Sequence, residues 1–376
     1  MLSKDELIRY NRHLILPGFG KEAQEKLKSS RVLVIGAGGL GCPVLQYLTA
    51  AGVGTIGILD FDVVDESNLQ RQVLYNTEDI GKSKAETAAK KLALQNPHLI
   101  FKTYNLELSK DNSLEIIGSY DLIVDGSDNF ATRYLVNDSC VIMKKPFVSG
   151  AIFKFEGQVS VFNYKNKDGI KGPTYRCLYP EAPDPKDVPS CSEIGVLGVL
   201  PGMIGAMQAN ETIKVITGIG EPLSGKLLTL DALTMQTNIL KFSPDEKNFA
   251  IKELGQYEEV CEVAENEFKP GYKEMTVFEL KEKLDQKENL ELLDVREEFE
   301  REICSIGGRL IPMKTISLHI EAIPEDKPVI VYCHHGMRSA MVVKFLSEEF
   351  GYKNLYNLDG GIHAWALNID KQMKQY

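Results

Sequence analysis

Arg31-Val-Leu-Val-Ile35-Gly36-Ala-Gly-Gly-Leu-Gly41 is the stretch that decides the fold of this chain. The apolar run up to Ile35 indicates a buried strand, and a helix is expected from Gly41 to Ala51. A glycine-rich turn between them points backbone N–H groups and the positive end of the helix toward an anion, with no side chain in the way. The sequence therefore predicts a nucleotide site that uses Gly36, Gly38, Gly39 and Gly41.

Strand and helix patterns alternate on both sides of this turn, which predicts an α/β fold with a doubly wound, mostly parallel Rossmann-like sheet. Alternating apolar residues from Ile152 to Tyr164 predict a hairpin in a strand-rich second half. The other expected elements are helices in the first 28 residues, at Ser83 to Leu94 and at Ile194 to Thr217, and strands at Thr55 to Asp60, Ile100 to Asn105 and Tyr120 to Asp125.

The length of 376 residues favours two domains, since single hydrophobic cores stop growing near roughly 250 to 300 residues. We expect a nucleotide-binding domain at 1–245, a charged linker at 246–270 and a smaller α/β domain at 271–376. The elements expected in the smaller domain are helices at Thr276 to Leu284 and Met337 to Phe350 and strands at Leu290 to Asp294 and Val329 to Tyr332.

Composition excludes several classes of function. A net charge of -10 argues against nucleic-acid binding, which needs clustered cations. No apolar stretch is long enough for a membrane span, and the acidic start of the chain is unlike a signal peptide. Seven cysteines form no CxxC pair, so we read them as thiols of a cytoplasmic protein.

The chemistry of the nucleotide site depends on the charges around it. Asp60 follows the next strand, where a carboxylate can accept hydrogen bonds from ribose hydroxyls, and these features alone favour an NAD-dependent oxidoreductase. However, Arg71, Lys84 and Arg12 supply three cations that a nicotinamide would not need. Cations suit adenylyl transfer, where charge builds up on the α-phosphate and on the leaving pyrophosphate. Asp128 follows a strand and is a candidate Mg²⁺ ligand.

Several motifs resemble the MoeB/ThiF family, whose members are relatives of ubiquitin-activating enzymes. The motifs are Arg9-Tyr-Asn-Arg12, Gly36 to Gly41, Asp60-Phe-Asp62, Ser67 to Gln72, Gly81 to Lys84 and Ser127-Asp-Asn129. The resemblance implies a homodimer, with Arg12 reaching ATP from the neighbouring subunit. It also implies that the acyl acceptor is the Gly-Gly terminus of a ubiquitin-like sulfur carrier. The ATP ligands that it implies are Gly39, Asp60, Ser67, Asn68, Leu69, Gln70, Arg71, Lys84, Asp128 and Asn129, with Asp128 also on Mg²⁺.

Cys191 follows a proline-rich loop and precedes an expected helix, whose N-terminus would favour a thiolate. A small packed residue is an equally good reading of the chemistry alone. In the family that the motifs resemble, a cysteine at this motif is the proposed acyl thioester or acyl disulfide site.

Cys333 ends an apolar strand and begins Cys333-His-His-Gly-Met-Arg-Ser339, which leads into a helix. Curled N–H groups, the helix dipole and Arg338 would all favour a thiolate. With Leu293 to Glu297 and Leu358 to Gly361, this loop resembles a rhodanese-like domain, in which the cysteine carries a persulfide. A phosphatase would place five residues between cysteine and arginine, whereas four intervene here.

One feature departs from the family pattern. Many members bind a structural zinc through two CxxC pairs, but this chain has Cys177 alone at the first pair and no cysteine from Lys241 to Phe249. Four-cysteine coordination is therefore impossible. We expect no zinc, and polar or apolar packing in its place.

The sequence thus predicts ATP-dependent adenylylation of a carrier, of molybdopterin-synthase type in preference to thiamine or tRNA thiolation, followed by sulfur transfer from Cys333. The sulfur donor would be a cysteine desulfurase or thiosulfate. Three alternatives stay open: a modifier thioester without sulfur transfer, an NAD-dependent oxidoreductase, and a non-catalytic scaffold that binds the carrier.

Overall fold

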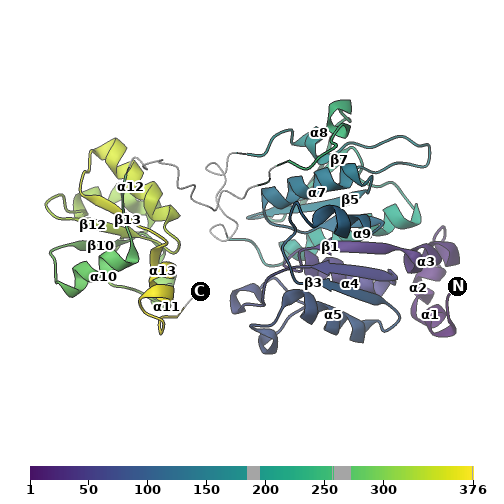
Figure 1. Ribbon diagram of the computed structural model, residues 1–376, viewed down its shortest axis with the longest axis horizontal. Helices are drawn as coiled ribbons and strands as arrows, with labels where there is room; N and C mark the ends of the chain where they lie inside the picture. The colour runs from purple at the N-terminus through teal and green to yellow at the C-terminus, as the bar shows by residue number, and fades with distance from the viewer. Residues whose placement is uncertain (184–194, 256, 258–271, 375) are drawn as a thin grey trace. The chain divides into compact units, whose positions relative to one another are not determined.

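The computed structural model describes residues 1–183, 195–255, 257, 272–374 and 376. The chain divides into two compact units, Met1–Glu262 and Val263–Tyr376 (Figure 1). Residues expected in the linker include the 3-10 helix η4 (Glu246–Phe249) and Leu254, which is buried in a core of the first unit. The first unit therefore continues past residue 245.

The first unit contains an eight-stranded sheet in the order β3-β2-β1-β4-β5-β6-β7-β8. Its first five strands are parallel and the last three join them in antiparallel pairs. The strands are β1 (Arg31–Ile35), β2 (Thr55–Leu59), β3 (Ile100–Tyr104), β4 (Leu122–Asp125), β5 (Phe147–Phe153), β6 (Glu156–Phe162), β7 (Lys226–Asp231) and β8 (Gln236–Lys241).

Helices cover both faces of this sheet because its central strands are apolar on both sides. Val32 and Val34 of β1 pack in one core, which includes residues of α4 (Gly41–Ala51), α5 (Lys84–Gln95) and α9 (Leu200–Thr217). Leu33 and Ile35 point to the other core. That core includes residues of α6 (Ser113–Gly118), α7 (Phe130–Ile142) and α8 (Tyr175–Leu178).

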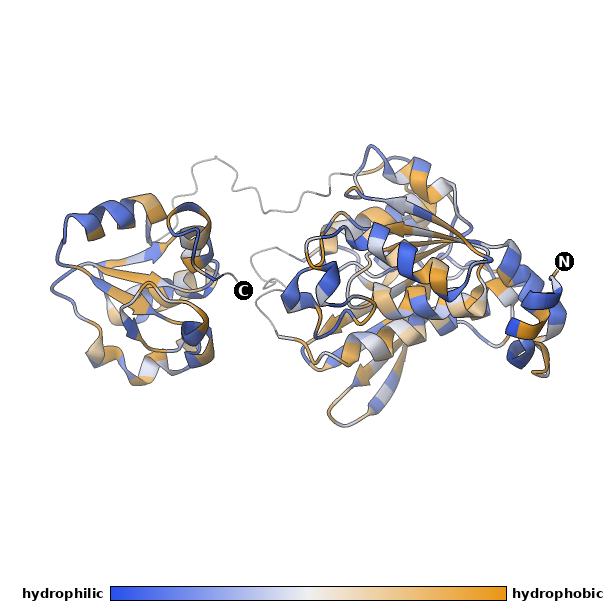
Figure 2. Cartoon of the chain, turned by 90° about the horizontal axis from the view of Figure 1, so that it is seen from below, coloured by the Kyte–Doolittle hydropathy of each residue, from blue (hydrophilic) through white to orange (hydrophobic). Residues whose placement is uncertain are grey.

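The second unit has a parallel five-stranded sheet in the order β11-β10-β12-β13-β9. Its strands are β9 (Lys273–Met275), β10 (Glu291–Asp294), β11 (Arg309–Leu310), β12 (Val329–Tyr332) and β13 (Leu355–Leu358). Its helices are α10 (Val277–Asp285), α11 (Glu298–Ile303), α12 (Met337–Phe350) and α13 (Gly361–Asn368), with the 3-10 helices η5 (Met313–Leu318) and η6 (Ile320–Ala322). Figure 2 shows the central strands of each unit mainly in the colour of apolar residues.

The α/β fold class and most of the expected elements are confirmed, with differences of detail. The N-terminal segment forms three short helices, α1 (Lys4–Arg9), α2 (Asn11–Leu14) and α3 (Gly20–Ser29), and leaves Ile8 and Ile15 exposed. The hairpin begins earlier in the chain than expected, because its first strand is β5 and the turn to β6 lies at 154–155. α7 was not expected, because most of its surface is buried and its sequence has no polar face.

No helix in the described parts of the chain is both long and apolar enough to span a bilayer.

Candidate active sites

The glycine-rich turn after β1 is shaped by close backbone contacts. Gly36 has a φ of +87°, and a Cβ there would lie 2.9 Å from the carbonyl oxygen of Gly126. A Cβ on Gly41 would lie only 1.9 Å from the carbonyl oxygen of Gly36. These approaches place the turn against the loop that follows β4, at the N-terminus of an eleven-residue helix. The arrangement suits an anion such as a phosphate group.

Asp60 is buried beneath this turn. Its carboxylate accepts hydrogen bonds from the backbone N–H groups of Ala37, at 2.7 Å, and Asp62, at 2.9 Å. Burial raises the pKa of Asp60, and the hydrogen bond from Ala37 and the charge of Lys84 oppose that effect. Asp60 therefore holds the turn in shape, and a carboxylate with two such bonds still has lone pairs for ribose hydroxyls.

Two of the expected cations lie at this turn. Lys84 begins α5, is 5% exposed, and places its Nζ 2.8 Å from a carboxylate oxygen of Asp62. The Cδ of Arg71 lies 3.8 Å from where a Cβ on Gly39 would be. Arg71 also donates to the carbonyl oxygen of Ser67, at 3.0 Å. Both cations therefore approach the anion site that the sequence predicted.

The segment from Ser67 to Gln70 forms the edge of the site. The 3-10 helix η1 (Glu66–Asn68) is capped by Asp65, which accepts hydrogen bonds from the N–H and hydroxyl groups of Ser67. The N–H of Arg71 donates to the carbonyl oxygen of Asn68 at 3.0 Å, so Asn68 lies in the same turn as Arg71. Gln70 contacts the residues before α9, because a Cβ on Gly198 would lie 2.5 Å from the carbonyl oxygen of Gln70.

Asp128 and Asn129 follow β4, which pairs in parallel with β1, so their loop emerges at the same edge of the sheet as the glycine turn. Asp128 is exposed. Asn129 caps α7 by accepting a hydrogen bond from the N–H of Thr132 at 2.7 Å. The described residues contain no cluster of three metal-ligating side chains. A single carboxylate nevertheless fits Mg²⁺, which takes its other ligands from water and phosphate oxygens.

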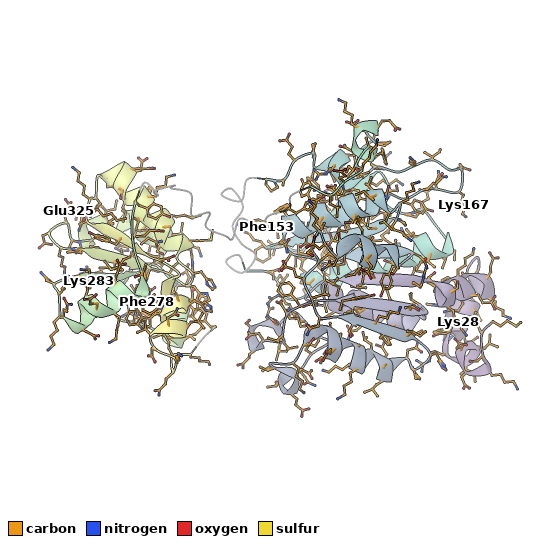
Figure 3. All side chains as sticks on the ribbon, viewed as in Figure 1. Lys28, Phe153, Lys167, Phe278, Lys283 and Glu325 are labelled. Carbon is orange, nitrogen blue, oxygen red and sulfur yellow. The ribbon has the colours of Figure 1, made fainter. Side chains whose placement is uncertain are left out.

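Arg12 lies elsewhere in the first unit. The N-terminal helices pack against the C-terminal ends of α4 and α5, where Gln24 donates to the carbonyl of Ala51 and Asn96 donates to Tyr10. The glycine turn lies at the other end of α4, about 16 Å away for an eleven-residue helix. Figure 3 labels Lys28 of α3 and Phe153 at the end of β5, which lie on opposite sides of the first unit. One chain alone does not bring Arg12 to Lys84.

Three further residues join this site that the sequence analysis did not single out. Asp62 pairs with Lys84. The fully buried Asp125 accepts hydrogen bonds from the N–H and hydroxyl groups of Ser127, which shapes the loop before Asp128. Arg133 donates to the carbonyl of Ser127 at 3.2 Å. Asp62 could have been found from the sequence, because it belongs to the motif Asp60-Phe-Asp62. The position of Arg133 depends on α7, which was not expected from the sequence.

Cys191 lies outside the described residues, so its expected role has no geometry to test it. The chain is described again from Gly195, and α9 begins five residues later. Pro201 packs against the glycine turn, because a Cβ on Gly39 would lie 3.1 Å from the Cβ of Pro201.

Cys177 is the single cysteine at the position where the sequence resemblance would place the first CxxC pair. Its Sγ accepts a hydrogen bond from the N–H of Asp245 at 3.3 Å and lies 3.6 Å from the amide nitrogen of Asn248. The hydroxyl of Thr174 lies 3.4 Å from the same sulfur. Polar packing around one thiol therefore joins α8 to η4 in this region.

Cys333 lies at the carboxyl end of the central strand β12 and is fully buried. Its Sγ accepts a hydrogen bond from the N–H of Gly336 at 3.1 Å and lies 3.4 Å from the hydroxyl of Ser339. The fourteen-residue helix α12 starts directly after this loop. Such a cradle of donors stabilises negative charge on sulfur.

Arg338 is paired with an acidic residue, and it also lies within electrostatic reach of the Cys333 sulfur. Its two terminal nitrogens donate to the two carboxylate oxygens of Glu300, at 2.7 and 2.6 Å. Burial raises the pKa of Glu300, but hydrogen bonds, above all those from Arg338, outweigh it and hold the pKa at about 2. The hydrogen bonds from Arg338 to Glu300 raise the pKa of Arg338 in turn, and the charge of the Cys333 sulfur also raises it. The charge of Arg338 is therefore largely offset by Glu300.

Three histidines gather beside the loop. The rings of His334 and His335 have centroids 4.0 Å apart, and His363 of α13 lies 5.5 Å and 4.7 Å from them. Burial, with the two neighbouring histidines, lowers the pKa of His334 to about 4. Burial also lowers the pKa of His335. The histidine pair of the loop is therefore uncharged at neutral pH.

Arg296 forms hydrogen bonds with several residues that lie near the Cys333 loop. It is fully buried and forms a two-bond ion pair with Asp294, at 2.9 and 2.7 Å. It also donates to the phenolic oxygen of Tyr376 at 2.8 Å, and that hydroxyl donates to Glu300 at 3.1 Å. The ring of Tyr376 stacks on His334 with centroids 4.2 Å apart. The sequence could not indicate that Glu300, His363 and Tyr376 meet here.

Comparisons with known proteins agree with both sites. Residues 10–252 match the ThiF family and residues 276–368 match the rhodanese-like domain. A probable adenylyltransferase/sulfurtransferase MoeZ of Mycobacterium tuberculosis is 46% identical over 380 residues, which covers 100% of this chain and 96% of the relative. An adenylyltransferase and sulfurtransferase MOCS3 of Drosophila grimshawi is 39% identical and covers 100% of this chain and 87% of the relative.

Other relatives match the first unit. A sulfur carrier protein adenylyltransferase of Thermus thermophilus is 55% identical over 231 residues, which covers 61% of this chain and 85% of the relative. The crystal structure of E. coli MccB with MccA-N7isoASN has a TM-score of 0.56 at 22% identity, over 65% of this chain and 73% of that chain, and supports the fold alone. These matches decide against the oxidoreductase and scaffold alternatives. The chain belongs to the ThiF family, carries a rhodanese-like domain after it, and is an adenylyltransferase with sulfurtransferase activity.

Proposed function

We propose that this enzyme adenylylates the C-terminal Gly-Gly carboxylate of a small ubiquitin-like sulfur carrier and then converts it to a thiocarboxylate. The observation that carries the first step is the placement of the glycine turn, Lys84, Arg71 and Asp128 at one edge of the large sheet. A polyphosphate would find backbone donors, two cations and a carboxylate for a metal within this edge.

Each residue would have a separate task in adenylylation. The carrier carboxylate attacks the α-phosphate and pyrophosphate leaves, so negative charge moves onto the leaving group. Lys84 and Arg71 would stabilise that charge, and Asp60 would keep the turn in shape and bind the ribose. Mg²⁺ held by Asp128 would neutralise charge on the phosphate oxygens.

Sulfur transfer would follow from Cys333. The outer sulfur of a Cys333 persulfide attacks the acyl carbon of the adenylate, and AMP leaves with the electron pair of the broken bond. A thiolate then attacks the sulfur of Cys333 in the acyl disulfide, which releases the thiocarboxylate. A thiol reductant would supply this thiolate, and a second equivalent would reopen the disulfide that it forms with Cys333. Cys191 stays a predicted acyl thioester or acyl disulfide site.

A homodimer would complete the adenylylation site with Arg12. Arg12 lies at the far end of its own unit, and three exposed apolar side chains surround its helix: Ile8 (76%), Ile15 (62%) and Leu16 (50%). The edge of the glycine turn exposes Phe61, Val63 and Val73 by 58%, 54% and 64%. Two such apolar surfaces are what contact between subunits would bury.

Mixing two inactive variants tests this arrangement. Arg12→Ala and Lys84→Ala each remove one part of a site that two subunits would build. If subunits exchange, half of the dimers are mixed and one of their two sites is intact, so about a quarter of the wild-type activity should return. No recovery after demonstrated subunit exchange would contradict the contribution of Arg12 in trans.

The function itself is tested by carrier-dependent ATP–pyrophosphate exchange. We expect exchange in the wild type and a loss of exchange in Asp128→Ala, with binding of the carrier retained. We favour a carrier of molybdopterin-synthase type, because the fused rhodanese domain resembles those on activators of such carriers. Capture and identification of the Gly-Gly protein that this enzyme adenylylates would decide between that carrier and those of thiamine synthesis or tRNA thiolation.

A further inference from the structure

The loop at Cys333 contains one guanidinium group, and an acidic residue holds it. Glu300 of α11 is buried, with a side chain 7% exposed, and its two oxygens take both terminal nitrogens of Arg338. The backbone N–H of Glu297 fixes the same carboxylate at 2.9 Å. Glu300 is therefore held in place to bind Arg338.

The second guanidinium group near this loop, that of Arg296, uses all its hydrogen-bond donors. Arg296 donates to Asp294, to the carbonyl oxygens of Glu300 and Cys304, and to Tyr376. The two loop histidines are uncharged at neutral pH, as their lowered pKa values require. The charge of Arg338 is paired with Glu300, and of its nitrogens only the buried Nε has no hydrogen-bond partner. Within the described residues of the loop, an incoming anion therefore meets this free Nε–H group but no cation without a carboxylate partner.

We propose that Glu300 determines which sulfur donors Cys333 accepts, by holding Arg338 and so denying a dianionic donor its counter-charge. The inference rests on the proposed role of Cys333 as the sulfur carrier. It places Glu300 as a positioning residue that acts through Arg338. The site then favours donors that bring their sulfane sulfur with little negative charge, and it disfavours thiosulfate.

The reaction that would be affected is simple to write. The Cys333 thiolate attacks the outer sulfur of thiosulfate, the S–S bond of the donor breaks, and sulfite leaves with the electron pair. Cyanide then attacks the outer sulfur of the persulfide, which gives thiocyanate and returns the thiolate. Methanethiosulfonate transfers the same sulfur with one negative charge less and releases methanesulfinate. The two donors therefore differ mainly in charge.

The test compares both donors on the full-length protein, with thiocyanate as the product measured. Each kcat/KM is divided by the rate of the same donor with a free thiol, which removes the difference in intrinsic reactivity. In the wild type we expect the normalised value for methanethiosulfonate to exceed that for thiosulfate by about tenfold. This comparison needs no variant, so it stands even where a variant fails to fold.

Glu300→Gln releases one arm of Arg338 and removes the opposing charge. We expect kcat/KM for thiosulfate to rise about tenfold, mainly through KM, and to fall again with added salt. The value for methanethiosulfonate should change by less than about threefold. Glu298→Gln removes the same charge from an exposed position of the same helix and should change neither value. Adding Arg338→Gln to Glu300→Gln should abolish the gain with thiosulfate.

Two results would overturn the inference. Equal normalised values for both donors in the wild type, or a Glu300→Gln protein whose two values change in parallel, would show that Glu300 has no role in donor choice. Failure of the proposed function would look different: Cys333→Ser would then match the wild type, or no variant would form thiocyanate with either donor. That result would overturn both proposals together.

Discussion

The adenylylation site and the sulfur loop handle negative charge in opposite ways. Around the glycine turn, Lys84 is buried, but it pairs with Asp62, whose side chain is 51% exposed and within reach of a ligand. Around Cys333, the guanidinium and carboxylate groups are paired in fixed two-bond geometry. A site for a polyanion needs cations that can change partner when the ligand arrives. A site for one sulfur atom needs donors fixed around it.

The two sites also differ in how the chain builds them. Residues of the first come from the segments that follow β1, β2 and β4, spread between positions 36 and 129, and they meet because these parallel strands end at one edge of the sheet. The core of the second is one continuous segment, 333–339, which comprises the bend at 333–336 between β12 and α12 and the first turn of α12. If each site acts alone, damage to one should leave the partial reaction of the other intact.

Cys333→Ser gives the largest expected effect and tests that independence. Thiocarboxylate formation should fall by at least about a thousandfold, because serine cannot carry a persulfide. Carrier-dependent ATP–pyrophosphate exchange should stay within about twofold of the wild type. Mass spectrometry of the carrier measures the first quantity. Cys304→Ser, in the same unit, is the matched control, and a comparable loss there would point to a general effect on the fold.

Lys84→Ala should damage the other site alone. We expect exchange to fall by about a hundredfold or more, because a preorganised cation at the developing charge is removed. Transfer of sulfur from donor to cyanide should be unchanged. Lys90→Ala, at an exposed position of the same helix, should leave both activities intact. Loss of sulfur transfer in Lys84→Ala would break the distinction between the sites.

Because Glu300 is paired with Arg338, the unfolding free energy of the second unit should depend on pH in the acid range. The folded pKa of Glu300 is about 2, below the ordinary value of 4.5, so its contribution is complete above pH 4.5 and is lost as the pH falls toward 2. The wild type should lose about 3 kcal/mol of unfolding free energy from this group over that range. Urea unfolding of the full chain, followed by a probe in the second unit, measures the loss.

Glu300→Gln should flatten that part of the profile, since glutamine does not titrate. If the unfolding free energy falls equally with pH in both proteins, the acid sensitivity comes from other carboxylates. That result would weaken the comparison between the paired charges at Cys333 and those at the glycine turn.

Asn129→Ala gives the smallest expected effect. Loss of the hydrogen bond to Thr132 should lower the unfolding free energy of the first unit by about 1 kcal/mol. Asn129→Ser should recover most of the stability, because serine also caps helices. ATP–pyrophosphate exchange measured on the same proteins separates helix capping from ATP binding. If Asn129 also contacts the nucleotide, Asn129→Ser will be stable but will catalyse exchange more slowly than the wild type.

Much of the adenylylation site could be predicted from sequence because local patterns carry it. A strand, a glycine turn and a helix specify the phosphate site, and Asp60, Arg71, Lys84 and Asp128 stand at fixed distances along the motifs. Parallel strand order then brings them together. Helix α7 has a mostly buried surface and no clear helical pattern in its sequence, so neither the helix nor the position of Arg133 could be predicted.

The sulfur site shows the limit of that reasoning. The sequence by itself determined that Cys333 ends a strand and precedes a helix, because these are local properties; of the expected backbone donors, the N–H of Gly336 reaches the sulfur. Only the tertiary structure decided that Arg338 is held by Glu300, that His363 joins the two loop histidines, and that Tyr376 covers His334. These contacts join residues far apart in the chain, and no local pattern of charge or hydrophobicity specifies which distant residues will meet.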